Sequence, residues 1–556
     1  MPNVHFLPAN RSIAVEKGTT VLEAARLAGV LIESPCNGAV VCGKCAVHLE
    51  PDSLHHIIRR GVHHLSNDQK LAGQVLSCEA EVIGDITVLV PDVAQEDLKI
   101  TSHGHALAVA LAPHVTKEFQ PDKGVTAVFH GGEIAYEEEG DTEGETFGVV
   151  VDIGTTTLVV SLVDLNTGME LAHASALNPQ SRHAQDVLSR IRIACEEKGL
   201  SEMRSGVIGE INRLIGQVAG EAEVHQDRIY EVVFSGNTCM LHLAAGINPR
   251  SLGQYPYTPE LTGGCWMSAN DLVLTIAPKG IVYLPPIISA YVGADITAGL
   301  QAVRLHEEQG TVLFIDIGTN GEMAIVHEGQ VRATSTAAGP AFEGMNITFG
   351  MRAGQGAIER FAILKGGDIC LKTIGNSPAT GICGSGLMDI VAELVRHGVI
   401  NKNGKFVSPE DPVLLPLLAE RLVKIDGKPA FKLTDNVYLS QKDVRQVQLA
   451  KGAIRAGVEF LLRHTGVNPV DLDKVLIAGS FGFHLTAESL VTIGLLPAET
   501  TGKIEFVGNT AKSGGKAFLL NHNSRIEVQR LVQEVKVVEL ANCADFDRVF
   551  VEVLSF

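Results

Sequence analysis

Three cysteines stand close together near the start of the sequence. Cys36, Cys42 and Cys45 follow the pattern C-x5-C-x2-C, and Cys78 follows later in the chain. Four thiolates suit either zinc or an iron–sulfur cluster. Zinc ribbons usually pair two short C-x2-C knuckles, whereas here three cysteines share one loop and the fourth is isolated. This asymmetry favours a [2Fe–2S] cluster, with zinc or unligated structural cysteines as the alternatives.

Two short motifs later in the chain have the composition of phosphate-binding turns. The stretches DIGTTT (152–157) and DIGTNGE (316–322) each place an acidic residue at the end of an apolar run, then a glycine, then hydroxyl or amide side chains. Such a turn aims backbone N–H groups and hydroxyls at phosphate oxygens, and the carboxylate can hold a hydrated Mg²⁺. One copy alone is also compatible with a plain β-turn, but here the motif occurs twice.

The cysteines need a scaffold that brings them together. Residues 3–7 and 12–15 have the pattern of short strands around the turn-forming PANRS, which predicts a hairpin. The stretch TTVLEAARLAGV then offers Thr20 as a helix N-cap with Glu23 three residues on, the pattern of a capping box. We expect a last strand at 85–90, after the fourth cysteine.

The phosphate-like motifs lie in sequence that alternates between strands and helices. Residues 147–168 and 310–329 both have the pattern strand, glycine turn, strand, and this recurrence predicts a duplicated domain with two similar lobes that start near 147 and 310. Three more glycine-rich stretches follow in compatible order. Residues 232–246 predict strand, turn and helix, residues 381–400 a turn into a helix, and residues 475–485 a strand and a turn.

The segment between the cysteine-containing part and the part with the phosphate-like motifs differs from both in its sequence pattern. Residues 93–146 contain no comparable motif, and we expect them to link residues 1–92 to residues 147–556. The charged run EEEGDTEGET at 137–146 is typical of a solvated face or loop.

Charge and hydropathy exclude several classes of partner. The formal net charge is −19, whereas proteins that bind nucleic acid usually carry basic patches that release counterions. The chain shows neither the basic start and apolar run of a signal peptide nor an apolar run of about 18 residues that could span a membrane. We therefore expect no nucleic acid, no membrane and a cytoplasmic location, where thiols stay reduced.

Both halves resemble known families. Residues 1–92, with their hairpin, helix, cysteine loop and late fourth cysteine, resemble the [2Fe–2S] ferredoxins with a β-grasp fold, and the five-residue spacing is similar to the adrenodoxin-like branch. Residues 147–556 resemble the superfamily of sugar kinases, acetate kinase, Hsp70 chaperones and actin, whose two lobes close over ATP. The expected fold class is therefore multidomain α/β, a ferredoxin domain, a linker and a duplicated actin-like ATPase with RNase H-like lobes.

Carried over position by position, the ATPase resemblance implies roles for residues of this chain. Contacts to ATP phosphates are implied for two sets of three residues, Gly154, Thr155 and Thr156 in the first turn and Gly318, Thr319 and Asn320 in the second. Carboxylates associated with Mg²⁺ are implied at Asp152 and Asp316. Glu322 is a candidate to position the attacking water or to form a second metal contact, with a plain surface role as the alternative. The edge of the site that binds the adenosine part of ATP would include Gly479, Ser480 and Phe481.

The order of ferredoxin, linker and ATPase resembles the reductive activators of corrinoid enzymes. Further stretches are similar to that family: SGNTCMLHLAAGI, YVGADITAGL at 291–300, the glycine-rich 336–359 and GNTAKSGGKAFLL at 508–520. The resemblance implies an enzyme that uses ATP to return the Co(II) corrinoid of a methyltransferase system to Co(I), with the electron supplied by the [2Fe–2S] cluster. It also implies a corrinoid protein partner and a low-potential electron donor, and it makes a homodimer plausible.

Other functions would use the same parts. An activator of 2-hydroxyacyl-CoA dehydratases is a rival, although in that family the cysteines lie inside the ATPase fold rather than in a separate module. A small-molecule kinase whose ferredoxin module senses redox state is the second enzyme alternative. The third alternative is not an enzyme but a redox-responsive binding protein, and the two phosphate-like turns argue against it. The apolar residues of 336–359 would form either a docking surface or part of a core.

Overall fold

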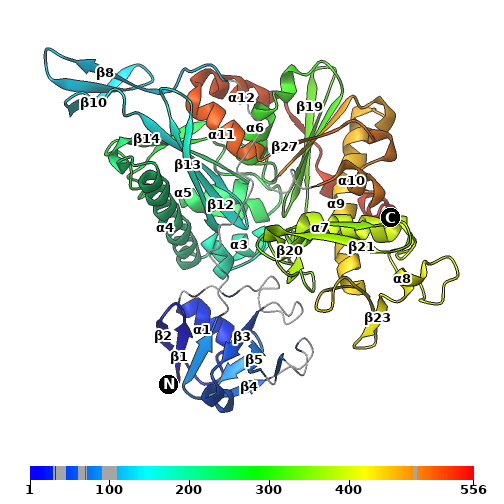
Figure 1. The fold of residues 1–556 in the computed structure, drawn as a ribbon. Helices are drawn as coiled ribbons and strands as arrows, with labels where there is room; N and C mark the ends of the chain where they lie inside the picture. The colour runs from blue at the N-terminus through cyan, green and yellow to red at the C-terminus, as the bar shows by residue number, and fades with distance from the viewer. Residues whose placement is uncertain are drawn as a thin grey trace.

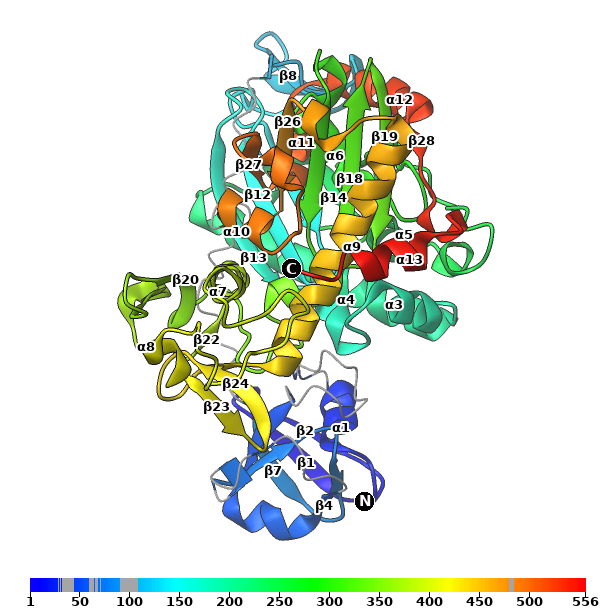
Figure 2. The ribbon, with the colours of Figure 1, turned by 90° about the vertical axis from the view of Figure 1, so that its right-hand side faces the viewer.

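The computed structural model describes residues 1–28, 30, 32, 45–59, 65, 69–70, 72–90, 109–479 and 485–556. These ranges form an N-terminal module, a small antiparallel sheet and two larger α/β lobes (Figures 1 and 2). None of the helices in these ranges is long and apolar enough to cross a membrane.

The N-terminal module is a five-stranded sheet with an α-helix, α1, packed on it. Its strand order is β2-β1-β7-β3-β5, and β1 pairs antiparallel with β2 and parallel with β7, so the predicted hairpin is confirmed. Thr20 caps the helix by accepting a hydrogen bond from the N–H of Glu23 at 3.2 Å. The elements are β1 (Asn3–Leu7), β2 (Arg11–Ala14), α1 (Val21–Leu27), β3 (Ala46–Leu49), β4 (Ile57–Arg59), β5 (Gln74–Leu76), β6 (Ala80–Val82) and β7 (Ile86–Leu89).

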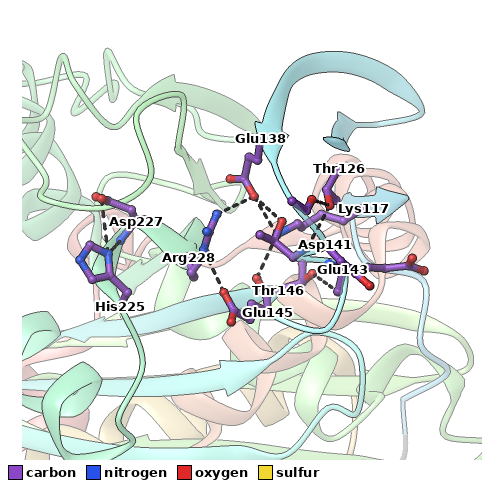
Figure 3. Close-up of polar contacts among 12 residues, drawn as sticks. Lys117, Thr126, Glu138, Asp141, Glu143, Glu145, Thr146, His225, Asp227 and Arg228 are labelled. Carbon is purple, nitrogen blue, oxygen red and sulfur yellow. Dashed lines mark hydrogen bonds and ion pairs between the residues drawn. The ribbon is translucent and has the colours of Figure 1, made fainter. Parts of the chain in front are cut away.

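A three-stranded antiparallel sheet follows in the segment that we expected to be a linker. It consists of β8 (Val115–Gln120), β9 (Val125–His130) and β10 (Glu133–Glu139), and it projects from the first lobe (Figure 1). Ion pairs connect the base of this sheet to the first lobe. The Glu138 carboxylate lies 3.0 Å from the Lys117 ammonium and 2.6 Å from the guanidinium of Arg228, the residue just before the first lobe's central strand (Figure 3).

The charged run that contains Glu138 is therefore only partly solvated. The Glu138 side chain is 9% exposed, and it also accepts hydrogen bonds from Thr142 at 2.6 Å and from the Tyr230 hydroxyl at 2.9 Å. The expectation of a wholly solvated run was wrong at this residue, because its partners Lys117 and Tyr230 come from outside the run. The neighbouring Glu137 and Glu139 are exposed, as expected.

The first lobe is built on a six-stranded sheet of order β13-β12-β11-β14-β16-β15. Its central strands β11 and β14 are buried on both faces, which explains their valine-rich sequences. Its strands are β11 (Phe147–Ile153), β12 (Thr157–Asp164), β13 (Glu170–Leu177), β14 (Ile229–Gly236), β15 (Cys265–Ser268) and β16 (Ile281–Leu284). Its helices are α3 (Val187–Ala194), α4 (Glu197–Glu221), α5 (Thr238–Ala245) and α6 (Ala294–Ala302).

The second lobe repeats this plan with the strand order β27-β26-β17-β18-β19-β28. The long helix α9 (Gln441–Thr465) packs on β18 and β19; it begins at a capping box of Ser440 and Asp443 and ends at Gly466 in the left-handed conformation (Figure 2). The strands are β17 (Val312–Ile317), β18 (Gly321–His327), β19 (Gln330–Thr336), β26 (Lys474–Ala478), β27 (Ile504–Gly508) and β28 (Lys536–Val537).

The remaining elements of the second lobe are helices and two small sheets. The helices are α7 (Gly384–Arg396), α8 (Pro416–Ala419), α10 (Ala487–Thr492), α11 (Thr510–Leu520), α12 (His522–Glu534) and α13 (Phe546–Glu552). The small sheets consist of β20 (Ala357–Ile363), β21 (Ile369–Thr373) and β22 (Gly381–Ile382), and of β23 (Leu422–Ile425), β24 (Lys428–Lys432) and β25 (Tyr438–Ser440). In the glycine-rich stretch 336–359, Phe342 is buried in the core of this lobe and Met345 is buried as well, so neither side chain forms part of an exposed surface.

The predicted duplication is confirmed by the pairing of the strands. In the first lobe β11 pairs antiparallel with β12 and parallel with β14, and in the second lobe β17 pairs antiparallel with β18 and parallel with β26. The lobes share a core in which Val150 of β11, Ala298 of α6, Phe314 of β17 and Phe518 of α11 are buried together. Helix α11 packs on α6 and on the first lobe's sheet, although it lies near the end of the chain (Figure 1).

Candidate functional site: a cleft between two phosphate-like turns

The two predicted phosphate turns face one cavity of about 190 Å³ between the lobes. The turn after β11 closes with a hydrogen bond from the Gly154 N–H to the Thr157 carbonyl at 2.9 Å, and the turn after β17 closes similarly between Gly318 and Asn320 at 3.0 Å. A Cβ atom on Gly154 would lie 2.7 Å from the Thr157 carbonyl oxygen, so this turn requires glycine. The hydroxyls of Thr156 and Thr319 lie 3.4 Å apart, which brings the two turns together.

Five carboxylates line the same cleft, and one of them is Glu343. Asp152, Asp316 and Glu322 were predicted from the sequence, and Asp295 in the first turn of α6 joins them. Burial raises the pKa of Asp152 to about 6 although Asn509 donates a hydrogen bond to it at 2.8 Å. Burial and the negative charges of their neighbours raise the pKa of Asp295 to about 7 and that of Asp316 to about 8. The pKa of Glu322 is raised in the same way, well above its usual value. The cleft therefore concentrates negative charge that a bound cation would stabilise.

Besides α6, the helices α5, α7 and α11 also start at the cleft. Asn237 caps α5 by accepting from the Met240 N–H at 3.0 Å, and its amide donates to the Thr155 hydroxyl at 3.0 Å. Asn509 caps α11 in the same manner and contacts Asp152. Helix α7 starts at the cleft with Gly384 and Ser385, and its N-cap residue forms no side-chain cap. The free N–H groups and dipole of a helix N-terminus favour anions such as phosphate.

Two of the predicted cluster cysteines lie together in the N-terminal module. Cys45 immediately precedes β3, and Cys78 lies in the turn between β5 and β6. Their sulfur atoms are 3.2 Å apart, and Cys45 is buried. The hydrogen bond with the Cys78 thiol lowers the pKa of Cys45 to about 6, against the effect of burial, which favours the thiolate form that ligates metals. Cys36 and Cys42 lie outside the described residues.

The structure brings together most of the predicted nucleotide residues. Twelve residues were predicted for the cleft in all, and ten of them line the cavity. Nine of the ten belong to or adjoin the two turns: Asp152, Gly154, Thr155, Thr156, Asp316, Gly318, Thr319, Asn320 and Glu322. Gly479, expected at the adenosine edge, also lines the cavity, while Ser480 and Phe481 lie outside the described residues.

Comparison with known proteins identifies the family. A family model described as the C-terminal domain of RACo, the ASKHA domain, matches residues 310–556, one described as the RACo middle region matches 147–308, and one described as a 2Fe-2S iron–sulfur cluster binding domain matches 4–82. The corrinoid activation enzyme RamQ of Eubacterium limosum is 30% identical over 553 residues, which cover 93% of each chain. The chain belongs to the family of corrinoid reductive activators.

Two further relatives agree with this assignment. A solved structure of a reductive activator for corrinoid, iron–sulfur protein is 31% identical, has a TM-score of 0.73 and covers 100% of this chain and 98% of its own. The [Co(II) methylated amine-specific corrinoid protein] reductase of Methanosarcina barkeri is 24% identical over 449 residues, 74% of this chain and 77% of that protein. The expected enzyme class, ferredoxin domain and actin-like ATPase domain of this corrinoid reductive activator are therefore confirmed.

Several residues of the cleft were missed from the sequence. Asp295 lies in YVGADITAGL, a stretch that resembled the family but to which no role was given. Asn237 and Asn509 both stand in the triplet Gly-Asn-Thr at the start of a helix, and this repeated triplet was a usable signal. Glu343, which accepts a hydrogen bond from the Thr319 hydroxyl, lies in the core stretch 336–359 and carried no comparable signal.

Proposed function

We propose that this protein is an ATP-dependent reductive activator that returns the inactive Co(II) corrinoid of a methyltransferase corrinoid protein to Co(I). Membership of the corrinoid reductive activators supports the reaction, and the names of the relatives support a corrinoid protein as partner. The observation that carries the ATP dependence is the cleft in which turns from both lobes come together, with Thr156 and Thr319 3.4 Å apart.

In this proposal the two turns hold the phosphates of ATP. The first contacts would come from Gly154, Thr155 and Thr156, and the second from the residues Gly318, Thr319 and Asn320. Gly479, together with Ser480 and Phe481, would lie at the adenosine edge. The N-termini of α5, α7 and α11 would add N–H groups and favourable dipoles, because they start at the cleft.

The residues of the cleft also fit Mg²⁺. Burial raises the pKa of Asp152, Asp295 and Asp316, and neighbouring negative charges raise those of Asp295 and Asp316 further, so a divalent cation would stabilise the ionised carboxylates. Among the described residues no group of three or more His, Cys, Asp or Glu side chains is arranged to hold an ion directly. This agrees with the habit of Mg²⁺ to keep several waters and to bind through one or two carboxylates and substrate phosphates.

The same carboxylates can direct water toward the terminal phosphate. Glu322 lies opposite Asp316 in the register of β17 and β18, and its side chain faces the cavity. A carboxylate in this position can accept a proton from the water that attacks phosphorus, which yields ADP and inorganic phosphate. Asp295 is a second candidate for this role, because it lines the same cavity.

The N-terminal module would supply the electron. When bound, a [2Fe–2S] cluster transfers one electron at a time, and Cys36, Cys42, Cys45 and Cys78 would hold it. For a one-electron couple each 59 mV is a factor of ten, so an uphill gap of about 300 mV corresponds to about five powers of ten. ATP can close such a gap only if the activator binds the Co(II) and Co(I) partners differently in its nucleotide-linked conformations. A low-potential donor would reduce the cluster, and a homodimer remains a prediction.

A spectroscopic assay tests the proposal. The reduced protein is mixed with a Co(II) corrinoid protein, and the visible spectrum is followed with and without MgATP. We expect Co(I) only with MgATP, and none from the Cys45→Ser variant, while Cys195→Ser, which changes a half-buried cysteine of the first lobe, behaves as wild type. ATP hydrolysis or phosphorylation of a small molecule without any Co(I), and unchanged in Cys45→Ser, would instead support the redox-sensing kinase.

A further inference from the structure

Arg190 of α3 is a buried cation behind the first phosphate turn. Its side chain is 0% exposed, and within the described part of the chain no carboxylate lies at ion-pair distance from it. Burial lowers its pKa to about 10, which leaves it charged at neutral pH. A buried charge without a partner is costly and needs an explanation.

The guanidinium is bound only to neutral acceptors. One terminal nitrogen donates to the Thr155 carbonyl at 2.6 Å, the other donates to the Gln180 side-chain oxygen at 3.2 Å, and Nε donates to the Ala184 carbonyl at 3.0 Å. The Met240 sulfur lies 3.1 Å from the second terminal nitrogen. The hydrogen bonds fix the position of the cation, and among the described residues its charge is offset only by the more distant carboxylates of Asp186 and Glu343.

Arg190 and Asn178 together hold three successive carbonyls of the turn from behind. The Asn178 amide donates to the Gly154 carbonyl at 2.9 Å, Arg190 donates to that of Thr155, and the Asn178 N–H donates to that of Thr156 at 2.9 Å. In a planar trans peptide the N–H points away from the carbonyl. The N–H groups that follow these carbonyls therefore point away from Arg190 and Asn178, and the residues of the turn line the cleft.

The cleft itself is poor in positive charge. Its lining includes five carboxylates but, among the described residues, Arg352 is its one basic side chain. Lys512, close behind the cleft, is paired with Glu170 at 2.9 Å. Nucleotide phosphates would thus meet strong negative charge, and the unpaired cation behind Thr155 would offset it.

We infer that Arg190 is a positioning residue for the nucleotide phosphates: it locks the first turn with its N–H groups toward the cleft and supplies positive charge behind them. This inference rests on the proposed ATPase function. Arg190 touches the backbone of the turn and not the nucleotide, so its effect passes through Thr155. Its contribution should grow with the negative charge of the ligand, whereas a purely structural role would affect all ligands of the cleft alike.

Binding of ATP, ADP and adenosine to the full-length protein tests this inference. Arg190→Met keeps much of the side-chain volume but removes the charge, and Arg190→Lys keeps the charge without the planar fork. Loss of a charged hydrogen bond is expected to weaken ATP binding about 10- to 100-fold in Arg190→Met. ADP should lose less, adenosine should be unchanged, and Arg190→Lys should fall between wild type and Arg190→Met for ATP.

The matched control is Arg192→Met, which changes an exposed arginine on the same helix and should leave all three affinities unchanged. An equal loss for ATP and adenosine, or no loss for ATP, in either Arg190 variant would overturn the inference. Arg190→Lys decides the matter if Arg190→Met does not fold. The assay measures binding alone, so its result is independent of whether the wild-type protein generates Co(I), which tests the proposed function separately.

Discussion

The ion pairs at the base of the β8–β10 sheet allow a quantitative prediction. Glu138→Gln preserves the shape of the side chain but removes the negative charge that faces Lys117 and Arg228. The Lys117 side chain is 0% exposed and that of Glu138 is 9% exposed, so the change leaves a buried cation uncompensated. Breaking a buried pair in this way costs about 3–5 kcal/mol. Since glutamine can still accept from Tyr230, we expect the lower end, about 3 kcal/mol.

Hydrogen exchange of the β9 amides measures this cost locally. A loss of about 3 kcal/mol in the free energy of opening corresponds to roughly 100-fold faster exchange. The control is Glu137→Gln on the same strand, whose ion pair with Lys123 spans 3.7 Å and whose side chain is 46% exposed. Exposed pairs of this kind contribute about 0–1 kcal/mol, so exchange should change at most a few-fold.

The result that would refute this reasoning is equal exchange in Glu138→Gln and Glu137→Gln. A double variant sharpens the test. Lys117→Met with Glu138→Gln removes the uncompensated cation together with its partner, and exchange should return part of the way toward wild type. If the double variant instead exchanges faster than Glu138→Gln, the cost does not come from the buried charge of Lys117.

Three further predictions concern a cluster cysteine, the packing of α11 on α6 and the pKa of Glu138. Cys78→Ser should abolish the visible absorbance of the [2Fe–2S] cluster while ATP binding persists; retained absorbance would show that Cys78 is not a ligand. Gly514→Ala would place a Cβ atom 1.8 Å from the Ala298 carbonyl oxygen and should cost about 3 kcal/mol in denaturant unfolding, whereas Gly209→Ala, with no atom within 4 Å, should gain about 0.5–1 kcal/mol; equal effects would contradict the packing argument. Burial would raise the pKa of Glu138, but hydrogen bonds from its neighbours lower it, so its stabilising effect is complete above the ordinary glutamate pKa and is lost as the pH falls through the lowered value. Exchange of β9, corrected for intrinsic rates, should therefore accelerate below about pH 4 in wild type but not in Glu138→Gln.

The parts of the fold that depend on local pattern were predictable. The duplication was visible because each lobe starts with a strand, a glycine turn and a second strand, and the same turns carry the phosphate-like residues. The hairpin and the cap at Thr20 likewise depend on residues a few positions apart. Cys45 and Cys78 were assigned to the same site because few roles other than metal ligation account for cysteines in this pattern.

The supporting residues of the cleft were not predictable in the same way. Asn509 reaches Asp152 across 357 positions, and Arg190 reaches Thr155 across 35. Nothing in the local sequence of α3 distinguishes the buried Arg190 from the exposed Arg192. Glu138 was misjudged for the same reason, because the groups that bury it belong to other strands.

The packing of α11 on α6 has a consequence for the synthesis of the chain. Helix α6 completes the first lobe in sequence order, but the helix that covers it, α11, is made about 200 residues later. At ~5–20 residues per second the ribosome needs roughly 10–40 s to reach it. During this interval the face of the first lobe that includes Val150 and Ala298 lacks its partner Phe518. The first half of this duplicated domain is therefore a nascent intermediate that needs protection from aggregation until its C-terminal helix emerges.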